Sequence, residues 1–224
     1  MVGILGEQMD QGALDQYKRY MKGTTTVGIV CSDGIVVGAD SRATMDTFIA
    51  SSEARKVFKI DNNVAMTIAG LVGDAQELIR IMKAQNEIYK MNEDRPLSPK
   101  SAANLLSIVL QENRMMPFYV QLILGGVDGD EPQLYSIDAM GGSTTESKFT
   151  SSGSGSLTAL GYIEDSYKKG LTTKDAIKLA ARALAIAMRR DSATGDSTIV
   201  AAITSSGYTE YTGKDLDKII GTAK

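Results

Sequence analysis

The chain has 224 residues, a formal net charge of -3, 43% hydrophobic and 23% charged residues, which suits one globular domain with a full core or two small ones. It contains no histidine, so a Ser-His-Asp or Cys-His catalytic pair and a His-ligated zinc or haem site are excluded. The interspersed charges argue against a nucleic-acid or membrane surface, and no stretch approaches the roughly 18–20 apolar residues of a transmembrane helix.

The first segment, residues 1–23, turns polar after a short apolar start. It lacks the basic and long apolar regions of a secretory signal, so it is interpreted either as a detachable prosegment or as a ragged native N-terminus. The single cysteine, Cys31, lies in an apolar run and is expected to be a small buried side chain, not a nucleophile. One cysteine allows no intrachain disulfide, which fits a reducing compartment.

Four strands are predicted next, arranged as two hairpins. The first two β-branched runs meet at Asp-Gly, a strong hairpin signal, and the second two meet at an Asp-Asn-Asn turn. The expected strands are residues 24–32, 34–41, 56–60 and 64–69.

From Asp74 onward, apolar residues recur at helical spacing. Asp74 is expected to cap this helix, with Glu77 three residues later completing a capping box, and the helix should end before Pro96. A second helix should begin at 98–99, where Ser precedes Pro, and stop at Pro117.

The second half of the chain repeats this order of strands followed by two helices. The expected strands are 119–127, 133–139 and 146–151, the helices 157–169 and 175–190, and the last strand 197–204 with an extension over 208–212. The second of these helices should be capped near 172–173, and residues 215–220 fit either a short helix or an amphipathic tail.

Helices in adjacent pairs and strands in hairpin runs argue against a parallel βαβ sheet. The run 119–127 is apolar at nearly every position, so both of its faces should be covered. The sequence therefore predicts an α+β fold in one domain: a four-layer αββα sandwich of two mostly antiparallel sheets flanked by helix pairs.

The stretch 22–30 joins a polar segment, a Gly-Thr bond and an apolar strand. If Thr24 becomes the N-terminus, its α-amino group has a reference pKa of about 7.7–8.0 and can accept a proton near pH 7. Nucleophile and base would then belong to one residue. Taken alone, the motif is more often an ordinary strand start.

Two charged residues, Asp40 and Lys56, stand at expected strand ends, evenly spaced along the chain with Thr24. Because strand ends of a hairpin sheet gather at one rim, a lysine there would lower the pKa values of the Thr24 amine and hydroxyl through its charge. The aspartate would keep that lysine charged and aimed. The alternative is an ordinary surface salt bridge, worth about 0–1 kcal/mol.

Three loops offer polar groups for such a site. Gly70 joins a strand to a helix, where its N–H could face a developing oxyanion, a donor worth about 100- to 1000-fold in rate, or simply form a helix turn. Segment 152–156 lacks a P-loop ending and a dinucleotide fingerprint, so a hydroxyl-rich turn is expected there. Segment 190–197 could hold an ammonium terminus or form an Asx-type turn.

Together these pieces resemble the proteasome β-subunit family of N-terminal-nucleophile threonine peptidases, and its archaeal 20S type most closely. The resemblance covers nearly the whole chain from Thr24 onward. Its motifs are Gly-Thr-Thr-Thr-Val-Gly at 23–28, Gly-Ala-Asp-Ser-Arg-Ala-Thr at 38–44, Arg-Lys-Val at 55–57, Ile-Ala-Gly at 68–70, Gly-Ser-Gly-Ser at 153–156, Arg-Asp at 190–191, and Gly195.

The resemblance implies roles for individual residues. The Thr24 hydroxyl attacks the scissile carbonyl, and the Thr24 amine, acting through a water, takes and returns the proton. Lys56 matches the family's catalytic lysine, and Asp40 matches the carboxylate paired with it. The remaining implied catalytic residues hold the nucleophile's terminus or donate to the oxyanion: Ser154, Asp191 and Thr194, and Gly70. Thr194 replaces the family's usual serine, which adds a methyl group.

The resemblance also implies a zymogen with a propeptide, 1–23, and a catalytic domain, 24–224. While Gly23 is attached, the Thr24 nitrogen is an amide and cannot act as a base, so autocleavage between them would activate the enzyme. Thr44 matches the residue whose backbone pairs with an extended peptide. The implied pocket positions are all apolar, which predicts cleavage after hydrophobic residues with low stringency: Ala43, Ala54, Ile68 and Val72.

The implied partners are other β-subunits in a seven-membered ring, α-type subunits, a regulatory ATPase ring reached through the α ring, and unfolded polypeptides. The implied location is the cytoplasm, with no cofactor, metal, nucleic acid or membrane. Three alternatives stay open. The chain could be a non-catalytic subunit of the same barrel, a related bacterial peptidase with sixfold rings, or an unrelated module that binds anions at 152–156.

Overall fold

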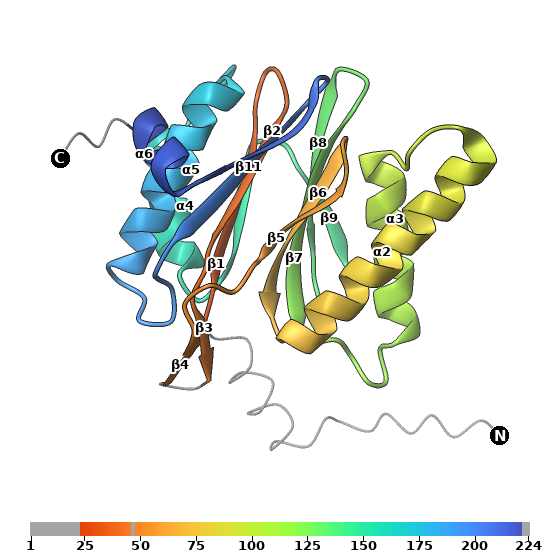
Figure 1. The fold of residues 1–224 in the computed structure, drawn as a ribbon, viewed down its shortest axis with the longest axis horizontal. Helices are drawn as coiled ribbons and strands as arrows, with labels where there is room; N and C mark the ends of the chain where they lie inside the picture. The colour runs from red at the N-terminus through yellow and green to blue at the C-terminus, as the bar shows by residue number, and fades with distance from the viewer. Residues whose placement is uncertain (1–22, 46–47, 221–224) are drawn as a thin grey trace.

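The computed structural model describes residues 23–45 and 48–220. In this part of the chain, two five-stranded antiparallel sheets stack face to face, and helices cover both outer faces (Figure 1). The predicted α+β class and the four-layer αββα sandwich are confirmed. The predicted propeptide lies outside the described residues except for Gly23.

The first sheet contains the N-terminal hairpin, with the Asp-Gly turn where the sequence predicted it. Its strand order is β10-β1-β2-β11-β12. Strands β1 and β2 pair antiparallel, with Thr26 opposite Ala39. Thr24, the residue before β1, and Asp40, the last residue of β2, therefore lie at the same end of the sheet. The bounds are β1 (Thr25–Val30), β2 (Ile35–Asp40), β10 (Phe149–Gly153), β11 (Thr198–Thr204) and β12 (Gly207–Thr212).

The second sheet has the order β5-β6-β7-β8-β9. Its central strand β7 is buried along almost its whole length, as its continuous apolar sequence predicted, because one face meets the other sheet and one meets helices. The bounds are β5 (Val57–Asp61), β6 (Val64–Gly70), β7 (Val120–Asp128), β8 (Glu131–Ile137) and β9 (Ser143–Glu146).

Each sheet is covered by its own helix pair. Helices α2 (Val72–Glu93) and α3 (Pro99–Glu112) pack on the second sheet, and α4 (Ser156–Ser166) and α5 (Thr173–Met188) pack on the first. The C-terminal segment is a helix, α6 (Gly213–Ile220), whose Leu216 joins the core under α5. Among the described residues, no helix has the length and apolar character needed to cross a bilayer.

The two sheets approach closely where Gly28 faces the opposite layer. A Cβ added at Gly28 would lie 2.8 Å from Ile123 and 2.9 Å from Leu134. Both of these side chains are fully buried in the cluster between the sheets, together with Ile35 and Val37 from β2. This interdigitated layer fixes the separation of the sheets and therefore the position of the strand ends.

One capping prediction was wrong. Helix α2 begins at Val72, directly after the strand, and no side chain caps it. The Asp74 carboxylate lies in the first turn and accepts the Tyr119 N–H at 2.6 Å, while Glu77 bonds to Arg80. Asp74 therefore connects the residue before β7 to α2, and the N-terminus of α2 has no side-chain cap.

The other two caps are confirmed. The Ser98 hydroxyl accepts the Ser101 N–H at 3.1 Å, and Pro99 is the first residue of α3. The Thr172 hydroxyl caps α5.

Two further differences concern strands. A small hairpin, β3 (Ala43–Met45) and β4 (Phe48–Ser51), forms a separate sheet that the sequence did not predict. It is short and mostly exposed, so it has no alternation of apolar and polar residues to reveal it. The single strand predicted at 146–151 is instead β9 and β10, because the chain crosses from one sheet to the other there.

The interlayer core gives a stability prediction. Replacing Leu134 by Ala leaves a cavity between the sheets and should lower the free energy of unfolding by about 2–5 kcal/mol. Ile108→Ala, at a half-exposed position on α3, is the control and should cost much less. Denaturant unfolding of the two variants measures both values, and equal losses would contradict this description of the core.

Candidate active site

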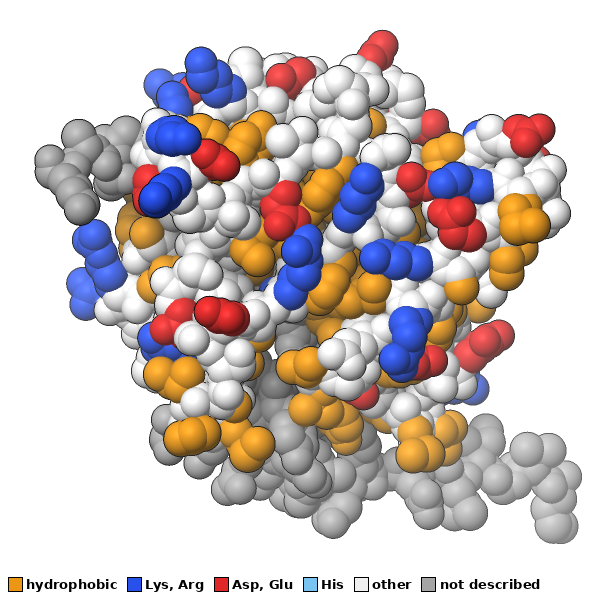
Figure 2. Space-filling model, in the orientation of Figure 1, with side chains coloured by type: hydrophobic (Ala, Val, Ile, Leu, Met, Phe, Trp, Pro, Cys, Tyr) orange, Lys and Arg blue, Asp and Glu red, His pale blue; other side chains and the backbone are white. Residues whose placement is uncertain are grey.

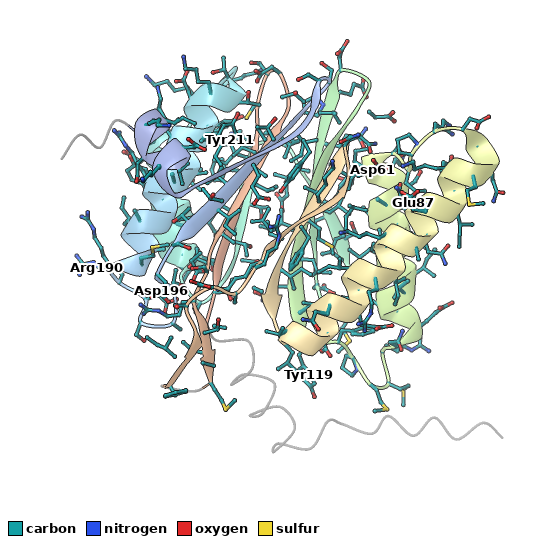
Figure 3. The ribbon with its side chains drawn as sticks, in the orientation of Figure 1. Asp61, Glu87, Tyr119, Arg190, Asp196 and Tyr211 are labelled. Carbon is teal, nitrogen blue, oxygen red and sulfur yellow. The ribbon has the colours of Figure 1, made fainter. Side chains whose placement is uncertain are left out.

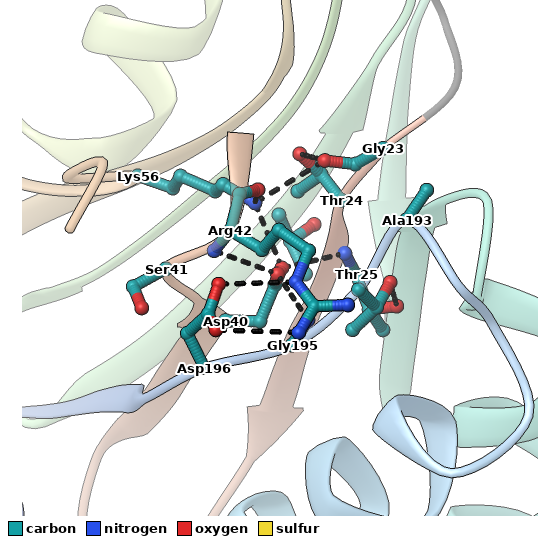
Figure 4. A network of polar contacts seen from close by, with 12 residues as sticks. Gly23, Thr24, Thr25, Asp40, Ser41, Arg42, Lys56, Ala193, Gly195 and Asp196 are labelled. Carbon is teal, nitrogen blue, oxygen red and sulfur yellow. Dashed lines mark hydrogen bonds and ion pairs between the residues drawn. The ribbon is translucent and has the colours of Figure 1, made fainter. Parts of the chain in front are cut away.

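The three residues predicted to carry the chemistry meet at one end of the sandwich (Figure 4). The Lys56 ammonium lies 2.9 Å from Asp40 Oδ1 and 3.3 Å from the Gly23 carbonyl oxygen. The Thr24 hydroxyl donates to the same carbonyl oxygen at 2.5 Å. The sheet ends position all three, since Thr24 precedes β1, Asp40 ends β2 and Lys56 precedes β5.

The Asp40–Lys56 pair is not a surface salt bridge. Asp40 is 1% exposed and Lys56 6% exposed, so both charges have lost most of their water. Such a pair is tolerated only when further hydrogen bonds satisfy the remaining polar atoms. Asp40 accepts the N–H groups of Thr25 and Gly195, each at 2.9 Å, and that of Arg42 at 3.1 Å.

Lys56 is held by oxygen atoms on several sides. Besides Asp40, its ammonium donates to the Arg42 carbonyl at 2.5 Å. Burial lowers the pKa of the Lys56 ammonium below its ordinary value, and the neighbouring Asp40 carboxylate opposes that change. A cation with a lowered pKa next to the Gly23 carbonyl can donate a hydrogen bond strongly to an oxygen that gains negative charge.

A second polar cluster lies on the other side of Thr24. The Asp191 carboxylate accepts the hydroxyls of Ser154 and Thr194, the latter at 2.5 Å. Ser154 Oγ lies 3.4 Å from the Thr24 nitrogen, and the Thr194 hydroxyl lies 2.7 Å from that of Thr25. The structure therefore brings the three predicted terminus-holding residues together beside the Thr24 backbone.

Two glycines allow this loop to pass so close to Thr24. A Cβ on Gly153 would lie 2.0 Å from the Thr24 carbonyl oxygen, and one on Gly155 would lie 2.1 Å from Thr25 Oγ1. Gly153 also has φ +90°, a conformation that favours glycine. The Gly-Ser-Gly-Ser sequence is thus a tight hydroxyl-bearing turn, as predicted.

Gly70 lies at the end of β6 with φ +133°. A Cβ there would lie 2.0 Å from the Tyr119 carbonyl oxygen, so the position accepts only glycine. The end of β6 lies close to Thr24. A Cβ placed on Gly153 would be 3.5 Å from the Ala69 side chain on β6 and 2.8 Å from the Thr24 carbonyl carbon, so both lie beside Gly153. The oxyanion role of the Gly70 N–H stays a prediction.

The residues predicted to bind substrate occupy different environments. Ala43, Thr44 and Ala54 are half-buried, and Val72 is 55% exposed at the start of α2. Ile68 is 3% exposed and belongs to the core under α2 and α3. Their roles in a pocket stay predictions.

Thr44 has an unusual side chain. Its hydroxyl oxygen is buried and finds no hydrogen-bond partner among the described residues. A Cβ at Gly23 would lie 2.3 Å from this oxygen, so Thr44 packs directly against the residue before Thr24.

Three contacts at this site were not predicted from the sequence: those of the Thr25 and Gly195 N–H groups with Asp40 and that of Arg42 with Asp196. Arg42 and Gly195 stand inside motifs that were recognised, but nothing in those motifs shows that Gly195 donates to Asp40 or that Arg42 pairs with Asp196 at 3.0 Å. Figure 3 shows Asp196 at the end of the first sheet, near the base of the β3–β4 hairpin.

The hairpin beside the site exposes apolar side chains. Met45 and Phe48 are each 71% exposed and Ile49 is 45% exposed. Hydrophobic atoms accordingly appear on the surface at this end of the molecule (Figure 2). In the part of the chain that the structure describes, no group of three His, Cys, Asp or Glu side chains is placed to hold a metal ion.

The αββα layers are those of the N-terminal-nucleophile hydrolase fold class. A family model described as Proteasome subunit matches residues 20–203. The chain belongs to the proteasome subunit family.

Its relatives include proteins named Proteasome subunit beta from archaea. The protein from Methanococcus aeolicus is 48% identical over 206 residues, which cover 92% of this chain and 95% of that protein. The protein from Archaeoglobus profundus is 46% identical over 221 residues, covering 99% of both chains. The protein from Methanosphaerula palustris is 49% identical over 198 residues, covering 88% of this chain and 94% of the relative. The resemblance to archaeal proteasome β subunits is thereby confirmed.

The burial of Cys31 predicts that its thiol is unreactive in the folded protein and takes no part in the candidate site. Cys31 is 4% exposed, as expected, and burial, together with the nearby Asp33 charge, raises the pKa of its thiol to about 12. The folded thiol is therefore expected to stay protonated at pH 8 and to react slowly. Iodoacetamide at pH 8 should label Cys31 in guanidinium chloride and leave it unlabelled in the folded protein. Equal labelling rates, followed by mass spectrometry, would contradict this environment.

Proposed function

We propose that this chain is the catalytic β subunit of an archaeal-type 20S proteasome, a threonine endopeptidase that hydrolyses unfolded polypeptides inside a closed barrel. The observation that carries the proposal is the contact of the Thr24 hydroxyl with the Gly23 carbonyl at 2.5 Å, with the Lys56 ammonium 3.3 Å from the same oxygen. A nucleophile and a cation thus converge on one peptide bond, the bond predicted to be cleaved.

Self-processing begins at that bond. The Thr24 hydroxyl oxygen attacks the Gly23 carbonyl carbon, its proton passes to the Thr24 nitrogen, and the C–N bond breaks to leave an ester. Water then hydrolyses the ester, which releases residues 1–23 with a new carboxylate and restores the hydroxyl. Lys56 stabilises the negative charge that develops on the carbonyl oxygen.

Release of the leader creates the base. The free Thr24 amine has a reference pKa of about 7.7–8.0, and Ser154, hydrogen-bonded to Asp191, lies beside it. In peptide hydrolysis the amine accepts the hydroxyl proton, through a water, and returns it to the leaving nitrogen, while Thr24 holds the acyl group as an ester. A second water completes the cycle, and the Gly70 N–H serves as an oxyanion donor.

The retained residues favour a catalytic subunit over a structural one. A non-catalytic subunit would be free to lose the threonine, the lysine or the processing glycine. In this chain Gly23, Thr24, Asp40 and Lys56 are all present, and hydrogen bonds link them in series from Thr24 through the Gly23 carbonyl and Lys56 to Asp40.

The proposed peptidase function also assigns roles in substrate binding. We assign Thr44 to backbone pairing with an extended peptide. Ala43, Ala54, Ile68 and Val72 contribute an apolar pocket that favours cleavage after hydrophobic residues. The assembly comprises β subunits in a seven-membered ring, α-type subunits and a regulatory ATPase, acting in the cytoplasm.

The nucleophile assignment predicts the behaviour of Thr24→Ala. This variant should keep its leader and lose peptide hydrolysis by about 10⁴-fold or more, because both reactions use the same hydroxyl. Thr145→Ala, at an exposed position on β9, is the matched control and should process and hydrolyse normally. Intact-mass spectrometry and a fluorogenic peptide with an apolar residue before the cleaved bond measure the two reactions. Robust hydrolysis by Thr24→Ala would contradict the assignment.

The assembled particle distinguishes the archaeal type from the bacterial alternative. Electron microscopy of the chain assembled with α-type subunits should show sevenfold rings. Sixfold rings would favour the related bacterial two-component peptidase instead.

A further inference from the structure

The guanidinium of Arg42 spans the loop between α5 and β11. Its Nε and Nη2 donate to the two carboxylate oxygens of Asp196, at 3.0 and 3.2 Å, and its Nη1 donates to the Ser192 carbonyl at 2.9 Å. One planar side chain therefore holds both ends of segment 192–196, which contains Thr194 and Gly195.

The backbone of Arg42 is fixed to the catalytic pair at the same time. Its N–H donates to Asp40 Oδ2 at 3.1 Å, and its carbonyl accepts the Lys56 ammonium at 2.5 Å. Figure 4 shows Arg42 between Lys56 and Asp196. The residue thus connects the Lys56 side of the site with the loop on the opposite side of Asp40.

The loop is shaped to receive this side chain. A Cβ on Gly195 would lie 2.3 Å from the Arg42 guanidinium carbon, so only glycine leaves room for it. Asp196 has φ +68°, a left-handed conformation that glycine adopts most readily and aspartate occasionally. The bidentate ion pair holds the Asp196 carboxylate in place, because the guanidinium fork matches a carboxylate.

We propose that Arg42 is a positioning residue for both self-processing and peptide hydrolysis. Its guanidinium keeps Gly195 on Asp40 and keeps Thr194 on Asp191, while its backbone keeps Lys56 aimed at the reacting carbonyl. The inference rests on the proposed threonine peptidase function. The ion pair contributes little to overall stability, since the Arg42 and Asp196 side chains are 22% and 26% exposed.

The first test is Arg42→Ala in the assembled particle. Misplacement of the catalytic groups should lower kcat by about 10- to 100-fold and slow leader removal in parallel, with KM changed by less than about twofold. Arg42→Lys should recover only part of kcat, because a lysine cannot form the bidentate contact. Arg80→Ala removes a surface ion pair on α2 and is the matched control, expected to behave as wild type.

The second test separates positioning from folding. Asp196→Gly removes the carboxylate but suits the positive φ, so the melting temperature should change by no more than about 4 °C while kcat falls as in Arg42→Ala. Because the two variants break one contact, the double variant should lose no more kcat than the more impaired single variant. If Arg42→Ala does not assemble, Asp196→Gly alone decides.

Wild-type kcat in Arg42→Ala or in Asp196→Gly, in a particle whose hydrolysis requires Thr24, would overturn the role of Arg42 and leave the proposed function intact. Losses that multiply in the double variant would also overturn it. A wild-type particle without Thr24-dependent hydrolysis would instead overturn the proposed function, and this inference with it.

Discussion

The arrangement of the site depends on one buried carboxylate, that of Asp40. A buried charge costs several kcal/mol unless it is compensated, and this carboxylate is compensated by donors from separate segments. These are the N–H of Thr25 at the start of β1, the N–H groups of Arg42 and Gly195, and the Lys56 ammonium before β5. Satisfying Asp40 therefore brings the threonine, the lysine and the loop after α5 into one geometry.

That geometry suits a protein without histidine. An imidazole commonly activates a hydroxyl nucleophile, and here a terminal amine takes its place in the proposed mechanism. In that mechanism the attached leader would block hydrolysis, because an acylated nitrogen cannot accept a proton. In the proposed mechanism Lys56, whose pKa burial lowers, stabilises the oxyanion that develops on the Gly23 carbonyl during processing.

Much of the fold, and part of the candidate site, could be predicted from the sequence. The hairpin signals place Thr24 and Asp40 at one end of a sheet. Lys56 was expected at the rim of that same sheet, but it precedes β5 in the other sheet, so its meeting with Asp40 depends on how the two sheets stack. The contact of Arg42 with Asp196 could not be predicted, because it depends on the pairing of β2 with β11, in which Asp40 faces Thr198. The β3–β4 hairpin lacks a buried face, so no alternation of apolar and polar residues reveals it. The Asp74 carboxylate accepts a hydrogen bond from Tyr119, which is distant in the sequence, so local spacing does not reveal that contact either.

The central claim is that activity requires a free amine on the residue that carries the nucleophile. Intact-mass spectra and peptidase rates, taken from one sample as it assembles, test this most directly. Activity should rise in proportion to the fraction of chains beginning at Thr24. Full activity in a particle whose chains all retain residues 1–23 would contradict it.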